Sequence, residues 1–64
     1  MSEIEEFKAA MAAAKLRQID LAHLAGVNYR TVWRWTTGYS PIPDYAWTII
    51  SLQQRVRELT AALV

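Results

Sequence analysis

Arg30 and Arg34 stand four positions apart in the segment NYRTVWRW and are the residues best suited to binding chemistry. A guanidinium group donates two parallel hydrogen bonds to a phosphate, or to the O6 and N7 atoms of guanine. Residues four apart lie on one face of an α-helix, so both side chains would point the same way. We expect at least one of them to contact a base edge.

Polar neighbours extend this candidate surface. Asn28 is a good N-cap for a helix that begins at Tyr29, and its amide could also reach adenine. Tyr29 suits a phosphate or a thymine methyl group better than a core. Thr31 is expected to touch the nucleic-acid backbone. Gln18 stands at the start of the preceding predicted helix, where its amide and the helix dipole suit a phosphate.

Trp33 has two interpretations. Trp35 fits a buried position, and residues two apart on a helix point in nearly opposite directions, so Trp33 is expected to be exposed in a single chain. It would then lie along a duplex groove, against sugars and thymine methyl groups, or become buried in a dimer contact. We favour the duplex.

Catalytic chemistry is not expected. His23 and Asp20 are three apart, but a single histidine without a second ligand or a nearby nucleophile is poor evidence for catalysis or metal binding. The sequence has no cysteine and no pair of carboxylates placed for acid–base work. We therefore expect no enzyme, no metal, no cofactor and no small-molecule ligand.

Two short helices joined by a tight turn would position these residues. The first is predicted over about 17–25, and Gly26 follows it, where a left-handed residue commonly ends a helix. The second is predicted over 29–37, with Val32 and Trp35 facing inward. The small side chain of Ala22 would let the two helices approach closely.

One predicted helix flanks this motif on each side. Ser2 and Glu5 form a capping box, so the first helix should begin at Glu3, and an apolar stripe carries it to about Ala14. After Gly38 and a proline-containing loop, the last helix should begin at Pro43 and run to the end. Its apolar residues recur at alternating steps of four and three: Tyr45, Ile49, Leu52, Val56, Leu59 and Leu63.

The two halves of that last helix have different expected roles. Ala46, Ile49 and Ile50 should close the core over Phe7, Val32 and Trp35. The second half, with Val56, Leu59 and Leu63, could fold against the first helix or pair with a second copy. We favour at least partial use in a homodimer.

Length and composition set the class. The 64 residues are 53% apolar and suffice for one small all-α domain, 1–64, of four helices. No run approaches the roughly 18 apolar residues of a membrane span, so a soluble, cytoplasmic protein is expected. Net charge is +1, but residues 15–40 hold four basic residues and one acidic residue, a segment charge of +3. We expect a local positive face on the motif.

The segment LRQIDLAHLAGVNYRTVWRWTTG, followed by prolines, resembles the Cro and phage-repressor family of helix-turn-helix proteins over about half of the chain. Trp33, where the family often has a small polar residue, and Arg17, where it often has a small N-cap, depart from the pattern. The residues that fit it are Leu16, Gln18, Leu21, Ala22, Leu24, Ala25, Gly26, Val27, Thr31, Val32, Arg34, Trp35, Gly38 and Pro43.

The resemblance implies a compact lambda-repressor-like domain that places residues 29–37 in the DNA major groove. It also implies a dimeric transcriptional regulator. The expected function is a homodimeric repressor or autoregulator on an inverted-repeat operator, in a prokaryotic or phage-infected cell. The alternative is a protein–protein interaction module that uses the same scaffold and the apolar last helix.

Overall fold

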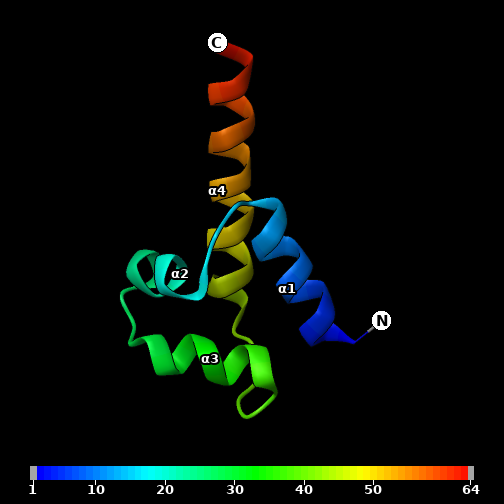
Figure 1. Ribbon diagram of the computed structural model, residues 1–64, viewed down its shortest axis with the longest axis vertical. Helices are drawn as coiled ribbons and strands as arrows, with labels where there is room; N and C mark the ends of the chain where they lie inside the picture. The colour runs from blue at the N-terminus through cyan, green and yellow to red at the C-terminus, as the bar shows by residue number, and fades with distance from the viewer. Residues whose placement is uncertain (1, 64) are drawn as a thin grey trace.

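The computed structural model describes residues 2–63, which form four helices and no strand: α1 Glu3–Ala13, α2 Gln18–Ala25, α3 Tyr29–Thr37 and α4 Asp44–Leu63 (Figure 1). The predicted all-α class, helix order and long last helix are confirmed. Three predicted bounds were off by one residue, because Ala14 and Arg17 are caps of α1 and α2, and α4 begins at Asp44 rather than Pro43.

The helices α1 and α2 lie on either side of the first half of α4, and α3 crosses below its start (Figure 1). Helix α2 packs against α3, and both α1 and α2 pack against α4. In Figure 1, α3 crosses the base of the molecule, whereas the C-terminal half of α4 extends away from the opposite side. The molecule is therefore elongated, with principal extents of 40 × 27 × 17 Å.

The core is built around Phe7, which is completely buried. Its ring meets Trp35 edge to face, with 6.3 Å between centroids, and Trp47 in the same way at 5.2 Å. These contacts join α1, α3 and α4 through one side chain. The other buried apolar residues are Met11, Ala14, Leu21, Ala22, Val32, Ala46 and Ile50, in agreement with the predicted inward faces.

The turn between α2 and α3 has the predicted geometry. Gly26 is left-handed with φ 70°, and the Val27 N–H donates to the Ala22 carbonyl at 3.0 Å. The Asn28 side-chain oxygen accepts a hydrogen bond from the Arg30 N–H at 2.9 Å, so the predicted cap of α3 is confirmed. Ala22 is only 3% exposed, and its small side chain allows the close approach of the two helices.

The left-handed turn that follows α1 was not predicted from the sequence, although the end of the helix near Ala14 was. Lys15 adopts a left-handed conformation with φ 59°, the conformation usually taken by glycine. The Leu16 N–H donates to the Met11 carbonyl at 2.9 Å, and the Lys15 N–H donates to the Ala12 carbonyl at 3.0 Å. This pair of bonds is a Schellman motif, which satisfies the last carbonyls of α1 at the cost of strain at Lys15.

Helix α4 changes its environment along its length. Ala46 and Ile50 are buried in the core, and Trp47 and Ile49 pack partly against it. Every residue from 55 to 63 is exposed. The interpretation that Val56, Leu59 and Leu63 fold against α1 is therefore wrong, because the helix has left the body of the molecule before reaching them.

Candidate nucleic-acid interface

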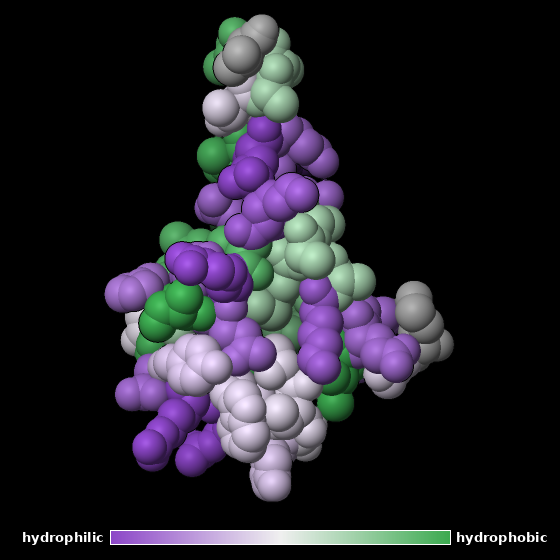
Figure 2. All heavy atoms as spheres, viewed as in Figure 1, coloured by the Kyte–Doolittle hydropathy of each residue, from purple (hydrophilic) through white to green (hydrophobic). Residues whose placement is uncertain are grey.

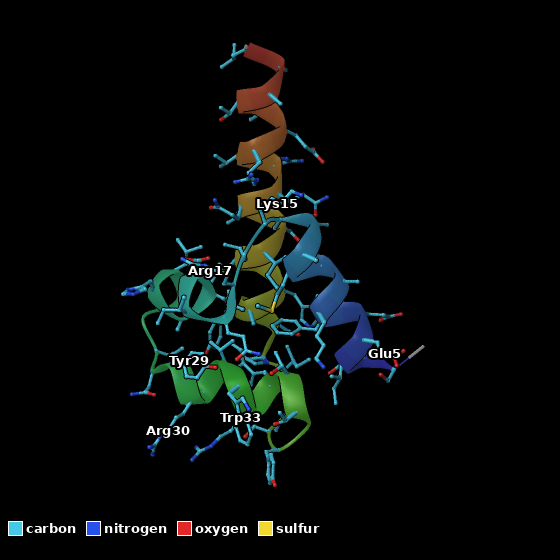
Figure 3. The ribbon with its side chains drawn as sticks, viewed as in Figure 1. Glu5, Lys15, Arg17, Tyr29, Arg30 and Trp33 are labelled. Carbon is cyan, nitrogen blue, oxygen red and sulfur yellow. The ribbon has the colours of Figure 1, made fainter. Side chains whose placement is uncertain are left out.

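One face of α3 is buried and the other is open to solvent. Val32, Trp35 and Thr36 point into the protein. Tyr29, Arg30, Trp33 and Arg34 are exposed, as predicted, with 42% of the Trp33 surface accessible. Arg30 and Trp33 both extend from the side of α3 that faces away from the body (Figure 3).

The exposed face of α3 is cationic. Among residues 2–63 the single ion pair joins Arg17 to Asp20, so neither Arg30 nor Arg34 is matched by a carboxylate. The sequence has no aspartate or glutamate from residue 21 to residue 43. Figure 2 shows strongly hydrophilic side chains projecting from this end of the molecule beside a paler surface. Both guanidinium groups are thus available to an external anion or base edge.

The predicted positive face is smaller than the segment charge of +3 suggested. Lys15 lies at the corner between α1 and α2, far from α3, and Glu5 is on another side of the molecule (Figure 3). Arg17 donates from its guanidinium to Asp20 at 2.9 and 3.1 Å, so most of its charge is compensated. The expected contribution of Lys15 and Arg17 to the face of α3 is corrected accordingly.

Asp20 also caps the start of α2. Its carboxylate accepts a hydrogen bond from the Arg17 N–H at 2.9 Å, in place of the small polar N-cap that this position lacks. Hydrogen bonds from the side chain and backbone of Arg17 lower the pKa of Asp20 to about 2, and the same ion pair raises the pKa of Arg17. Asp20 is therefore committed to a structural role.

An aromatic pair lies beside the arginines. The ring of Trp33 stacks on that of Tyr39, with centroids 5.4 Å apart and planes 22° from parallel. Gly38, left-handed with φ 85°, turns the chain back, and the Tyr39 N–H donates to the Arg34 carbonyl at 3.0 Å. Sequence reasoning missed this stack. The two aromatic residues lie on either side of a helix end, and the spacing of residues does not reveal the direction in which the chain turns there.

Gln18 lies at the junction of α2 and α3. Its side-chain nitrogen donates to the Thr36 hydroxyl at 3.2 Å, and that hydroxyl donates to the Trp33 carbonyl at 2.9 Å. The Gln18 oxygen is buried and has no hydrogen-bond partner among the described residues. The half-buried Gln18 thus ties α2 to α3, and Thr36, which is 3% exposed, was not identified from the sequence.

The remaining candidate residues are placed as follows. Asn28 is exposed at the start of α3, and Thr31 is half-buried. Within residues 2–63, no three histidine or acidic side chains gather closely enough to hold a metal ion. Over the same residues, no helix has the length and apolarity needed to cross a membrane.

Comparison with protein-family models, curated proteins and solved structures found no match to this chain.

Proposed function

We propose that this chain is a sequence-specific double-stranded DNA-binding transcriptional regulator that places α3 in the major groove. The observation that carries the proposal is the exposed face of α3, where Arg30 and Arg34 have no acidic partner among residues 2–63 and adjoin the Trp33–Tyr39 stack. An α-helix with its side chains is about 10–12 Å in diameter, and the major groove, about 12 Å wide, admits such a helix.

Each exposed residue has a role in this proposal. Arg30 and Arg34 donate to guanine or phosphate, and Asn28 adds an adenine contact while it caps α3. Trp33, held by Tyr39, lies against sugars and thymine methyl groups. Contacts to the DNA backbone come from Tyr29, Thr31 and the N-terminus of α2 near Gln18, where backbone N–H groups lack helical partners.

The regulator acts as a cytoplasmic homodimeric repressor or autoregulator on an inverted repeat. Half-sites would lie about 34 Å apart, one turn of the duplex, and binding would occlude a promoter. The similarity of residues 16–38 to the Cro and phage-repressor pattern supports this choice, as does the glycine turn between α2 and α3.

Selection of bound duplexes from a random pool, followed by sequencing, tests the proposal. The expected result is an enriched inverted repeat. The affinity of the protein for this duplex should fall steeply with added salt, because phosphate contacts release counterions. A pool without any enriched sequence, together with no measurable duplex affinity at low salt, would refute DNA-binding regulation.

Asn28→Asp gives a sharper test of where the DNA lies. Aspartate caps a helix as well as asparagine does, so the variant should fold with nearly unchanged stability. Its carboxylate would repel phosphates at the start of α3, and duplex affinity should fall. Ala61→Asp is the matched control, since it adds the same negative charge at an exposed site on α4 and should not weaken DNA binding.

A second candidate function is a protein–protein interaction module, which the exposed apolar residues of α4 favour. Tight capture of another protein with no affinity for duplex DNA would support this alternative. Salt-sensitive duplex binding that requires Arg30 and Arg34 would support the regulator.

A further inference from the structure

The outer half of α4 carries an exposed apolar stripe, which we define as Leu52, Val56, Leu59 and Leu63. Their side chains are 56%, 54%, 60% and 89% exposed. The helix around them has no support from the body, because residues 55–63 are exposed on every face. A helical segment this short is marginal in water by itself, and an apolar stripe on it is unfavourable to leave in solvent.

We propose that the stripes of two copies of this chain pair in parallel as a two-stranded coiled coil. This inference deepens the proposed function by specifying how its dimer forms, and its consequence for DNA rests on that function. Within the stripe, Leu52 and Leu59 occupy d positions of a heptad and Val56 and Leu63 occupy a positions; the half-buried Ile49 is at the preceding a position. β-Branched residues at a with leucine at d are the combination that favours two parallel strands.

Charge also favours the parallel arrangement. In a parallel pair the flanking g and e positions place Thr48 opposite Gln53 and Arg55 opposite Thr60 of the second copy, so no like charges meet. The antiparallel register that sets Leu52 opposite Val56, and Ile49 opposite Leu59, brings Arg55 against Arg55 of the second copy. Facing like charges destabilise a helix pair, so this register is disfavoured.

The shape of the molecule gives the parallel pair a consequence for DNA. Helix α3 lies at the end of the molecule opposite the free end of α4 (Figure 1). Parallel pairing therefore places both α3 helices at the same end, related by a twofold axis, as an inverted repeat requires. Antiparallel pairing would place them at opposite ends of a helix about 30 Å long.

Single-cysteine variants test the orientation, since the chain has no cysteine of its own. In the parallel pair, Leu52→Cys and Leu63→Cys should each form a disulfide with the same residue of the second copy under mild oxidation. Ala61→Cys is the matched control, because position 61 is exposed on the outer side of the coil. Cross-linking of the control as efficiently as the other two, or of none of the three, would overturn the proposal.

Sedimentation equilibrium tests the association itself. The mass of the natural sequence should rise from 7.3 kDa toward twice that value as concentration increases. Leu59→Lys should stay monomeric, whereas Ala61→Lys should associate like the natural sequence. Both substitutions lie outside the core, so near-native tryptophan fluorescence will verify that the body is folded. A natural sequence that remains monomeric up to millimolar concentration would exclude the coiled coil.

Duplex binding separates this inference from the proposed function. Leu59→Lys should bind a single half-site with the natural affinity and should bind the full inverted repeat at least about 10-fold more weakly, because the second half-site no longer gains from linkage. Equal affinity of both proteins for the full repeat would refute the coiled coil and leave the DNA-binding function intact. If the protein binds no duplex but still cross-links to a second copy at positions 52 and 63, the DNA-binding function is refuted and the coiled coil is retained.

Discussion

Arg30 and Arg34 are the side chains on which sequence choice depends in the proposed complex. Replacing either by alanine should cost about 1–3 kcal/mol of binding to the selected duplex, and it should relax the preference at one base pair if that arginine contacts a base. Lysine at the same position keeps the charge but loses the two parallel donors, so it restores a phosphate contact better than a base contact.

The measurement is a binding titration of each variant against the selected duplex and its single-base-pair changes. Arg57→Ala, on the exposed outer half of α4, is the control for loss of one positive charge. If all three alanine variants lose affinity equally and none changes its base preference, the arginines contribute only general electrostatic attraction.

Asp20 makes the stability of α2 depend on pH. The pKa of Asp20 is about 2 in the folded chain, whereas the pKa of an unperturbed aspartate is about 3.9. A lowered folded pKa means that the stabilisation is complete above the unfolded value and is lost as pH falls through the folded value. The contribution should therefore be present at neutral pH and disappear between about pH 4 and pH 2.

Denaturation of the natural sequence and of Asp20→Asn over this pH range measures that contribution. The difference in stability should be constant above pH 5 and shrink on acidification, and salt should reduce it because both partners are exposed to solvent. Parallel curves down to pH 2 would show that the Arg17–Asp20 pair does not stabilise the fold.

At the scale of the helices, Lys15 and Gly26 both adopt the left-handed conformation, and a substitution at each gives a prediction about stability. Lys15→Gly should stabilise the fold by about 0.5–1 kcal/mol, since glycine takes φ 59° without strain. Gly26→Ala should destabilise it by about 1 kcal/mol through backbone strain alone, because an added Cβ would meet no atom of the described residues within 4 Å.

Urea denaturation of both variants, with the natural sequence as reference, measures these changes. Lys15→Gly should also keep the natural DNA affinity, because Lys15 is far from α3 (Figure 3). A loss of stability in Lys15→Gly would mean that the lysine side chain contributes more than its backbone strain costs.

The helices were predictable where local chemistry decides them. Gly26 specifies the end of α2 through a left-handed conformation that few other residues favour, and Asn28 specifies the start of α3 through its side-chain hydrogen bond. The Lys15 turn was not predictable, because neighbouring packing imposes it on a residue that does not favour it. Whether Val56, Leu59 and Leu63 pack against α1 or stay exposed depends on the direction in which α4 leaves the body of the molecule. The periodicity of the sequence does not determine that direction.

The candidate site was predictable to a similar extent. Periodicity separated the exposed Trp33 from the buried Trp35. It gave no sign that Tyr39 stacks on Trp33, or that Gln18 and Thr36 form a hydrogen bond, because these contacts join elements whose relative placement only the folded core determines.

At the scale of the whole molecule, the core is so small that a single aromatic ring makes a large contribution to the free energy of unfolding. A domain of 64 residues has a free energy of unfolding of about 3–10 kcal/mol. Phe7→Ala should remove about 3–5 kcal/mol, because it leaves a cavity where α1, α3 and α4 meet around Trp35 and Trp47. The variant should be largely unfolded at 37 °C.

Phe7→Leu retains an apolar side chain at the same place and should be much less affected. Thermal denaturation followed by tryptophan fluorescence compares the two variants. A Phe7→Ala protein that melts within about 8 °C of the natural sequence would show that the domain does not depend on this ring.

The solvent exposure of residues 55–63 also divides the chain into two classes of backbone amide. Opening this segment breaks no contact with the Phe7 core, so in dilute solution its amide hydrogens should exchange for deuterium far sooner than those of α1 and of the first half of α4. Raising the protein concentration should slow exchange in the segment alone. The amides of the last two turns would then report, residue by residue, how much of the protein has found a second copy.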